Sequence, residues 1–154
     1  MTSTIDTQSL LTQQFDSTAG SQSLADYKGH NIVLYFYPKD NTSGCTQESS
    51  DFRDHKVAFD KLNTVILGVS RDSLKSHHKF ITDHDLNFTL ISDPDEILCN
   101  LCKVMQEKSM YGRRYMGIER STFLFDTNGN LVNEWRKVKV AGHVAEVLCA
   151  VQQL

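Results

Sequence analysis

The sequence predicts an α/β fold in which a central mixed β-sheet is flanked by helices. Two observations support this prediction. Short β-branched and aromatic segments alternate with helical segments along most of the chain, and a strand–turn–strand pattern followed by a closing helix ends it. This order is typical of parallel strands joined by helices, with an antiparallel hairpin completing the sheet.

The first strand and the helix after it have the clearest pattern. Residues 32–37 form a β-branched and aromatic run. Pro38 ends that run, because proline has no N–H to donate to a neighbouring strand. A helix is expected at 45–62, where Phe52 and Phe59 are spaced to share one face.

The remaining elements follow from caps, turns and spacing. An Asn-Gly pair supplies the positive φ of a tight hairpin turn, and apolar residues at i, i+3, i+4 and i+7 give a helix a core face. The expected elements are a strand at 65–69, a helix from Asp72 or Ser73 to His84, a strand at 88–91, a short helix from Pro94 to about Met105, strands at 121–125 and 131–138 around the turn 127–130, and a helix with Val144, Val147, Leu148 and Val151 on its core face. The first twenty or so residues are polar and carry no assignable pattern.

Length and charge limit the possible classes of protein. The chain has 154 residues, and we expect a single domain over 1–154, because no repeat, linker or internal boundary is visible. Sixteen basic residues against nineteen acidic residues give a net charge of −3. This balance offers no electrostatic reason to expect binding to nucleic acid or to an anionic membrane.

The N-terminal segment and the hydropathy pattern predict the compartment. The first residues have no basic region followed by an apolar core, and no run approaches the length of a membrane span. We therefore expect a cytoplasmic protein. Thiols are kept reduced in the cytoplasm, so its four cysteines are more typical of packing or reactive groups than of a disulfide framework.

Cys45 has the strongest signal for chemistry. It follows a strand and a polar turn and falls in the first turn of the expected helix. Free backbone N–H groups and the positive end of the helix dipole stabilise a thiolate at such a position. Thr42 lies three residues earlier and can direct a hydroxyl to the same place, while Pro38 shields it. The sequence therefore predicts a reactive thiol rather than a small buried apolar side chain.

These residues also carry a family resemblance. Pro38, Thr42 and Cys45 fill the pattern Pro-x-x-x-Thr-x-x-Cys, which resembles the active-site loop of the peroxiredoxins. Further matches to the bacterioferritin comigratory protein (peroxiredoxin Q) subfamily extend from about residue 26 to the C-terminus. They include Tyr-Phe-Tyr-Pro-Lys-Asp at 35–40, Asp-Phe-Arg-Asp at 51–54, Ser-Asp-Pro-Asp at 92–95, Gly-Ile-Glu-Arg-Ser-Thr-Phe at 117–123 and Trp-Arg-Lys-Val-Lys-Val-Ala-Gly-His at 135–143. One departure is Ser43, where the subfamily usually has proline.

The resemblance implies a thioredoxin-like fold and the reduction of hydrogen peroxide or organic hydroperoxides. It implies that Cys45 is the peroxidatic nucleophile and becomes a sulfenic acid. Thr42 would hydrogen-bond the thiolate and the peroxide, Arg120 would keep the thiolate charged, and Pro38 would limit access of water. Arginine suits this task because it stays protonated and its several donors can serve sulfur and oxygen together. No cofactor and no metal ion are implied.

The sequence departs from the subfamily in how the sulfenic acid would be resolved. Many members carry a resolving cysteine five residues after the nucleophile, where this chain has Ser50. Others carry it on the next helix, at the position of Ile81. We therefore expect a one-cysteine cycle in which an external thiol (thioredoxin, glutaredoxin or glutathione) attacks oxidised Cys45. The subfamily resemblance also favours a monomer.

The other three cysteines are assigned mainly to packing. Cys102 shares a helix face with apolar residues and is expected in the core. Cys149 is expected to pack beside Leu148, and Cys99 lies at the flank of its apolar stripe, where it could be more exposed. The alternative cycle is therefore an atypical two-cysteine one that uses Cys99. No second pair or histidine at zinc spacing follows the Cys99–Cys102 pair.

Two other classes of function compete with a thiol peroxidase. A thiol–disulfide oxidoreductase would need a cysteine three residues after Cys45, where this chain has Glu48. A non-catalytic redox sensor stays open. Among the histidines, His77 and His78 fall on a helix where a hydrogen-bonded interface histidine is the usual role, and Lys137 and Lys139 alternate with valines as in a strand with one solvated face.

Overall fold

The computed structural model describes residues 5–154. Its strands are β1 (Phe15–Ser17), β2 (Gly20–Gln22), β3 (Asn31–Phe36), β4 (Thr64–Ser70), β5 (Thr89–Ser92), β6 (Met105–Met110), β7 (Arg113–Ile118), β8 (Ser121–Phe125) and β9 (Leu131–Trp135). Its helices are α1 (Thr7–Thr12), the 3₁₀ helix η1 (Leu24–Tyr27), α2 (Ser43–Asp54), α3 (Lys56–Lys61), α4 (Leu74–His84), α5 (Ile97–Leu101) and α6 (His143–Gln152).

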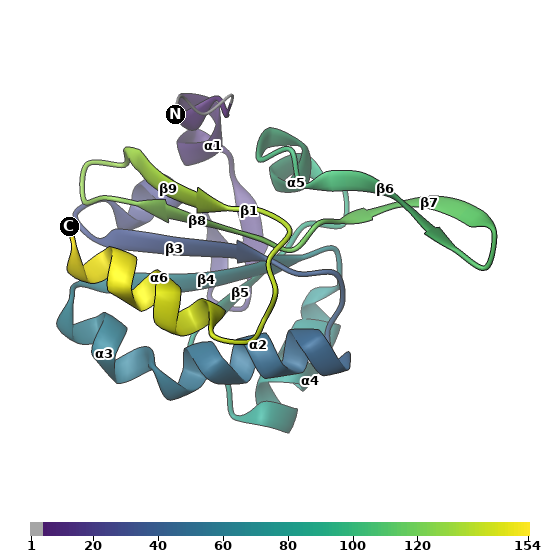
Figure 1. The fold of residues 1–154 in the computed structure, drawn as a ribbon. Helices are drawn as coiled ribbons and strands as arrows, with labels where there is room; N and C mark the ends of the chain where they lie inside the picture. The colour runs from purple at the N-terminus through teal and green to yellow at the C-terminus, as the bar shows by residue number, and fades with distance from the viewer. Residues whose placement is uncertain (1–4) are drawn as a thin grey trace.

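Seven of the strands form one mixed sheet in the order β2-β1-β5-β4-β3-β8-β9. The pairs β3–β4 and β4–β5 are parallel, while β8 pairs with β3 and with β9 in antiparallel fashion. Helices cover both faces of this sheet (Figure 1). The predicted α/β class with a central mixed sheet flanked by helices is therefore confirmed.

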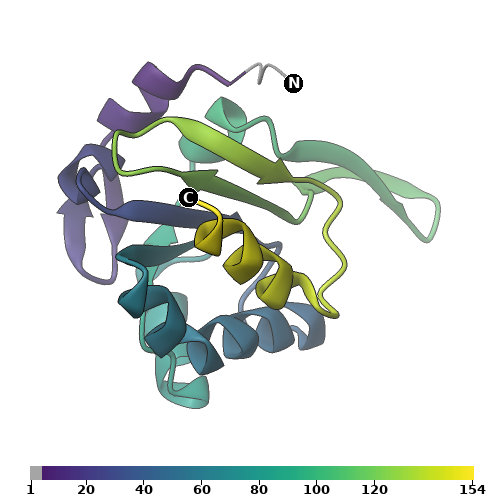
Figure 2. The same ribbon diagram turned by 60° about the vertical axis from the view of Figure 1, so that its left-hand side comes forward.

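Strand β3 divides the interior into two cores. It is buried along its whole length. Because successive side chains of a strand point to opposite faces of the sheet, its residues enter both cores in turn. Ile32, Leu34 and Phe36 enter the core under α1 and α5, and Val33 and Tyr35 enter the core under α2, α3, α4 and α6. Figures 1 and 2 show these helices on the two sides of the sheet. We call them the α1/α5 core and the α2/α6 core.

The helix expected at 45–62 is two helices. Helix α2 begins two residues earlier than expected, at Ser43, and helix α3 follows after His55. His55 departs from helical backbone angles, with φ −101° and ψ 3°, and its ring Nδ1 lies 2.8 Å from the carbonyl oxygen of Asp51. Histidine side chains near the end of a helix can bond its last carbonyl groups in this way. The predicted apolar face survives the break, since Phe52 and Phe59 are both fully buried.

Two other predicted elements are shorter than expected because of residues in the left-handed region. Glu96 has φ 60°, so α5 begins only at Ile97, and Met105 already lies in β6. Lys137 has φ 50°, which cannot continue a strand, and β9 ends at Trp135. The prediction that Lys137 and Lys139 lie in a strand was therefore wrong.

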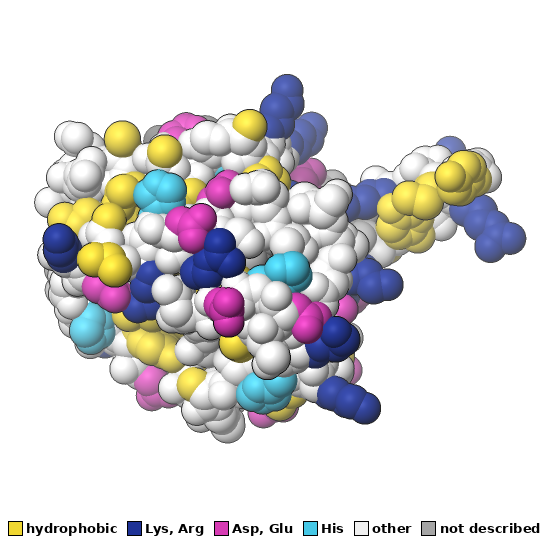
Figure 3. Space-filling model, turned by 90° about the horizontal axis from the view of Figure 1, so that it is seen from below, with side chains coloured by type: hydrophobic (Ala, Val, Ile, Leu, Met, Phe, Trp, Pro, Cys, Tyr) yellow, Lys and Arg dark blue, Asp and Glu magenta, His cyan; other side chains and the backbone are white. Residues whose placement is uncertain are grey.

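The hairpin β6–β7 had no predicted counterpart. It projects from the body of the molecule (Figure 1), and most of its residues are exposed. Strands that are exposed on both faces have no reason to alternate apolar with polar residues, so hydrophobic periodicity does not reveal them. Figure 3 shows hydrophobic and basic side chains along this arm. The exposed apolar residues on it are Met110, Tyr111, Tyr115 and Met116.

The helices agree with the expectation that no segment is long and apolar enough to span a membrane. Within residues 5–154, every helix is too short or too polar to cross a lipid bilayer.

Candidate active site

Cys45 lies where β3 leads through a short loop into α2. Thr42 is the N-cap residue, and its carbonyl oxygen accepts the first helical hydrogen bond from the Thr46 N–H at 2.8 Å. Cys45 is the third residue of α2 and is 1% exposed. The predicted position in the first turn of a helix is therefore confirmed. There, the helix dipole and free backbone N–H groups favour a negatively charged sulfur.

The loop before α2 is held in place mainly by Asp40. This side chain is buried and accepts hydrogen bonds from Tyr37 Oη at 2.6 Å and Ser76 Oγ at 2.8 Å. The Asp40 N–H donates to Asp72 Oδ2 at 2.8 Å. Pro38 is half-buried within the same loop. The loop that carries Pro38 and Thr42 is thus tied to the body of the fold on both sides of Pro38.

The Thr42 hydroxyl is directed back into its own loop. Its Oγ1 donates to the carbonyl oxygen of Lys39 at 2.8 Å, and the residue is exposed. Within residues 5–154, no hydrogen bond joins Thr42 to Cys45. The predicted bond from Thr42 to the thiolate is therefore not made in this structure, although Thr42 lies beside Cys45 at the start of α2.

Arg120 contacts Cys45 from a distant part of the chain. It lies in the two-residue link between β7 and β8, and its carbonyl oxygen accepts a hydrogen bond from the Val138 N–H at 3.0 Å. Its Nη2 donates to Cys45 Sγ at 3.4 Å, across 75 positions of sequence. The structure thus brings together the two residues for which the resemblance implied a joint role.

Glu48 is a site residue that the sequence reasoning did not assign to the chemistry. Arg120 Nη1 donates to Glu48 Oε1 at 2.7 Å, and Glu48 is fully buried. Glu48 Oε2 is also buried and has no hydrogen-bond partner among the described residues. A signal for it existed in the sequence, because positions i and i+3 of a helix share a face and Glu48 follows Cys45 by three residues.

Burial and charge act against each other at this pair. Burial raises the pKa of Glu48 to about 7, although Arg120 acts to lower it. Burial also disfavours the Arg120 charge, but Glu48 and Cys45 outweigh it and raise the pKa of Arg120 above its usual value. Arg120 therefore stays charged beside the sulfur.

Gly44 makes room for the guanidinium. A Cβ atom at this position would lie 3.2 Å from Arg120 Nη2, closer than ordinary van der Waals contact. The backbone of Gly44 is helical, so the need for glycine here is steric rather than conformational. The residue immediately before Cys45 thus sets how closely Arg120 approaches.

A second cation lies near the base of the hairpin. Lys108 Nζ donates to the carbonyl oxygen of Ile118 at 2.6 Å. Partial burial lowers the pKa of Lys108, and the Arg120 charge lowers it further, while Cys45 acts in the opposite direction. Lys108 is therefore electrostatically coupled to the site. It was missed because the hairpin itself had not been predicted.

The remaining cysteines lie elsewhere in the fold. All four cysteines are free thiols. Cys99 and Cys102 are fully buried in the α1/α5 core, whereas Cys45 lies in the α2/α6 core on the other side of the sheet. The prediction that Cys102 packs in the core is confirmed.

Two expectations about the other cysteines were wrong. Cys99 is buried rather than more exposed, because it packs with Leu98 and Cys102 in the α1/α5 core, and its N–H is bonded to Asp93 Oδ2 at 2.8 Å. Cys149 is exposed rather than packed, because the core side of α6 is occupied by Val144, Val147 and Val151. Burial raises the pKa of both Cys99 and Cys102 above the usual range, and Asp93 adds to this effect at Cys99.

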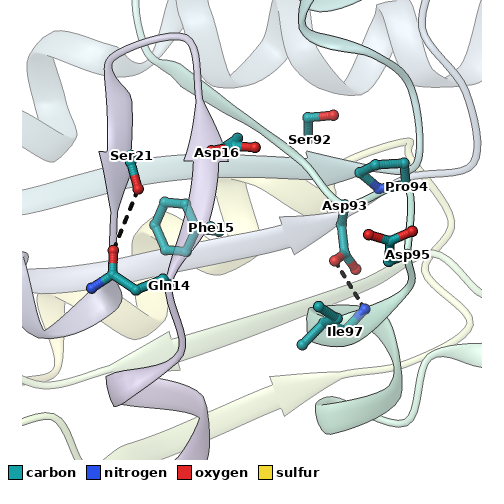
Figure 4. A pocket seen from close by; sticks show the side chains of 9 residues that line it. All are labelled: Gln14, Phe15, Asp16, Ser21, Ser92, Asp93, Pro94, Asp95 and Ile97. Carbon is teal, nitrogen blue, oxygen red and sulfur yellow. Dashed lines mark hydrogen bonds between the residues drawn. The ribbon is translucent and has the colours of Figure 1, made fainter.

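A separate pocket of about 160 Å³ lies next to β5 and the start of α5 (Figure 4). Its lining includes Phe15, Pro94 and Ile97, together with the carboxylates of Asp16 and Asp95. Asp93 also lines it, but this side chain bonds the backbone N–H groups of α5. None of the candidate catalytic residues lines this pocket.

Known proteins are similar to this chain in sequence and in fold. Residues 7–134 match the AhpC/TSA family. Peroxiredoxin Bcp of Bacillus subtilis is 55% identical over 125 residues, which cover 81% of this chain and 80% of that protein. Peroxiredoxin Bcp of Xanthomonas campestris is 52% identical over 136 residues, which cover 88% of this chain and 85% of that protein.

Solved structures give the same result. Xanthomonas campestris peroxiredoxin Q superposes with a TM-score of 0.90 at 47% identity, covering 95% of this chain and 93% of that chain. A structure of the Xanthomonas campestris bacterioferritin comigratory protein, from work on its alkyl peroxide reduction activity, superposes with a TM-score of 0.90 at 46% identity, covering 95% and 94% of the two chains. The predicted family and thioredoxin-like fold are confirmed: this chain belongs to the AhpC/TSA family and, within it, to the peroxiredoxins of the Bcp or Q type, which are thiol-dependent peroxidases.

Proposed function

We propose that this peroxiredoxin reduces hydrogen peroxide and organic hydroperoxides with Cys45 as its peroxidatic cysteine. The observation that carries the proposal is the contact between Cys45 Sγ and Arg120 Nη2 at the N-terminus of α2. A thiolate there has two sources of stabilisation, the helix terminus and a guanidinium that stays charged. The related Xanthomonas campestris protein, studied for alkyl peroxide reduction, supports the substrate class.

The first step is the attack of the Cys45 thiolate on one peroxide oxygen. The S–O bond forms as the O–O bond breaks, so that Cys–S⁻ and ROOH give Cys–SOH and RO⁻, and RO⁻ takes up a proton to leave as ROH. Negative charge moves from sulfur to the departing oxygen during this step. Arg120 can stabilise the charge as it moves, because its Nη2 donates to the sulfur while its Nη1 is held by Glu48. Thr42 is proposed to contact the peroxide, and Pro38 to limit access of water.

We propose a one-cysteine cycle for the second half of the reaction. Ser50 and Ile81 occupy the two positions where subfamily members carry a resolving cysteine, and Cys99 and Cys102 lie across the sheet from Cys45. An external thiol therefore attacks the sulfenic acid, releasing water and forming a mixed disulfide. A second external thiol then attacks the mixed disulfide, which regenerates the Cys45 thiol and leaves a disulfide between the two external thiols. Thioredoxin, glutaredoxin and glutathione are the candidate reductants.

The test combines peptide mapping with turnover. The reduced protein is treated with one equivalent of peroxide, trapped with a sulfenic-acid reagent and mapped by mass spectrometry. The expected product is a single trapped sulfenic acid on Cys45, with turnover lost in Cys45→Ser and retained in Cys99→Ser and Cys149→Ser. A dominant disulfide from Cys45 to another cysteine would overturn the one-cysteine cycle. Full turnover in Cys45→Ser would overturn the assignment of Cys45. Oxidation of Cys45 without turnover by any of the three reductants would favour the redox-sensor alternative.

We also propose that the protein acts as a cytoplasmic monomer. The four free thiols support a reducing compartment. Light scattering during gel filtration tests the monomer, and fractionation of cells that make the protein tests the compartment. Should the protein associate, the exposed apolar residues of the β6–β7 hairpin give the surface to mutate first.

A further inference from the structure

Both ring nitrogens of His77 face hydrogen-bond acceptors. His77 Nδ1 lies 2.7 Å from Asp40 Oδ2, and Nε2 lies 2.8 Å from the carbonyl oxygen of Ile91. The side chain is fully buried. A neutral imidazole carries one N–H and can satisfy one of these acceptors, whereas the imidazolium carries two and satisfies both. Burying an unsatisfied acceptor in this position would be costly.

Both carboxylate oxygens of Asp40 accept hydrogen bonds from side-chain hydroxyl groups. Tyr37 donates to Oδ1 at 2.6 Å, and Ser76 donates to Oδ2 at 2.8 Å. Burial raises the pKa of Tyr37 well above its usual value, with Tyr35 and Asp40 adding to the effect, so the Tyr37 hydroxyl keeps its proton and donates it. With Tyr37 and Ser76 donating to it, Asp40 serves as an acceptor towards His77 as well, so the geometry favours a hydrogen on His77 Nδ1.

A second carboxylate lies close to His77. Asp72 from the loop after β4 belongs to the same cluster, in which one polar atom each of Asp40, Asp72 and His77 lie within 4.8 Å of one another. Two carboxylates thus face one imidazole, with Tyr37 as the third titratable neighbour, while β5 contributes the Ile91 carbonyl. Asp72 Oδ2 accepts from the Asp40 N–H and from Ser70 Oγ. The carboxylate and imidazole atoms that face one another in this cluster thus have protein partners.

This cluster lies between helix α4 and the loop that leads to Cys45. Asp40 separates Pro38 from Thr42 in that loop. The neighbouring Asn41 is also bonded to α4, through Asp83 Oδ2 at 3.3 Å and His84 Nε2 at 2.7 Å. Helix α4 therefore acts as the support on which the loop is docked.

We propose that a doubly protonated His77 positions the active-site loop, and through it the N-terminus of α2 and Cys45, relative to Arg120. His77 touches neither the sulfur nor the peroxide and is a positioning residue. The kinetic part of this inference rests on the proposed role of Cys45, while the protonation state of His77 does not.

The protonation state is tested by ¹⁵N NMR on the labelled wild-type protein at neutral pH. The His77 resonances are assigned by through-bond correlation with the backbone signals of His77 in the wild-type protein. An imidazolium gives two ring nitrogens with similar shifts, and this is the expected result. Two widely separated shifts, typical of a neutral ring, would overturn the inference. Because this measurement uses the wild-type protein, it holds even if a variant does not fold.

Two variants test the positioning role. In His77→Asn the amide nitrogen takes the place of Nδ1 and keeps the bond to Asp40. In His77→Gln it takes the place of Nε2 and keeps the bond to Ile91. We expect the rate of Cys45 oxidation to fall at least about tenfold in His77→Gln, because a hydrogen bond to a charged partner is lost, and by less than about threefold in His77→Asn. His78→Asn and His78→Gln, on the exposed face of α4, are the matched controls and should leave the rate unchanged.

The outcomes separate this inference from the proposed function. Equal rates in His77→Gln and wild type, or equal losses in both His77 variants, would overturn the positioning role. Full peroxidase activity in Cys45→Ser would instead overturn the role of Cys45 and leave the NMR result on His77 standing.

Discussion

Arg120 Nη1 donates to Glu48 Oε1 at 2.7 Å, so a fully buried carboxylate fixes the guanidinium that reaches the Cys45 sulfur. Cys45 and Glu48 lie on the same helix, three residues apart, while Arg120 comes from the link between β7 and β8. The pair therefore couples the position of α2 to the start of β8. A buried charge pair of this kind contributes little net stability, but loss of one partner is costly.

Arg120→Lys should lower the rate of Cys45 oxidation by about a hundredfold, the usual cost of losing a donor to developing charge. An ammonium group cannot reproduce the planar fork that bonds Glu48 and Cys45 at once. Stopped-flow measurement of the reaction with hydrogen peroxide checks this. Arg114→Lys on the hairpin, where the side chain is 83% exposed, is the control and should react like wild type. An Arg120→Lys rate close to that of wild type would show that the bidentate contact has no kinetic role.

Gly44→Ala should lower the rate of Cys45 oxidation by about tenfold, because a small displacement of a catalytic group is costly. The added Cβ would meet Arg120 Nη2 at 3.2 Å and push the guanidinium away from the sulfur. The melting temperature should not fall, since alanine is a better helix former than glycine. Ser43→Ala, at the exposed preceding residue, is the matched control. Loss of stability without loss of rate would contradict the steric explanation.

Glu48 should make stability depend on pH in an unusual direction. Burial raises the pKa of Glu48 to about 7 from an ordinary value of 4.5. Between these two values the native state holds a proton that the unfolded chain has released, so the free energy of unfolding falls as pH rises. The contribution is fully present below about pH 4.5 and is lost by the time pH passes about 7.

Urea titrations of reduced wild type and Glu48→Gln across this range measure the effect. The wild-type stability, taken relative to Glu48→Gln, should decline by a few kcal/mol as pH rises. Glu107→Gln, at an exposed position on β6, is the control and should follow wild type. A pH-independent difference between wild type and Glu48→Gln would mean that Glu48 does not change its charge in this range.

The thiols should react with iodoacetamide in an order set by burial. Cys149 is exposed and should be modified first, whereas Cys99 and Cys102 should resist until the protein unfolds. Burial raises the pKa of these two thiols and so removes the reactive thiolate. Timed peptide mapping checks the order, and Cys149→Ser should lack the earliest product. Modification of Cys99 ahead of Cys149 in the native protein would contradict the placement of α5.

Several features could be predicted because they depend on local sequence. The run at 32–37, the core spacing of Phe52 and Phe59 and the position of Cys45 in the first turn of α2 all follow from patterns within one or two elements. The same patterns failed at Glu96 and Lys137, where a left-handed residue ends an element early. They gave nothing for β6 and β7, whose exposed faces impose no apolar period.

By itself, the sequence determined the fold class, the family and the position of Cys45 at a helix terminus, because strand runs, helix periods and the Pro38–Thr42–Cys45 spacing are written along the chain. The tertiary structure decided which groups meet that sulfur and which do not. Arg120 contacts Cys45 across 75 positions of sequence, and the buried Glu48 holds Arg120 in place. The sheet separates Cys45 from Cys99. These contacts depend on how strands pair and on which face of an element is buried. Both follow from the packing of the whole chain, whereas local patterns record only the preferences of each segment.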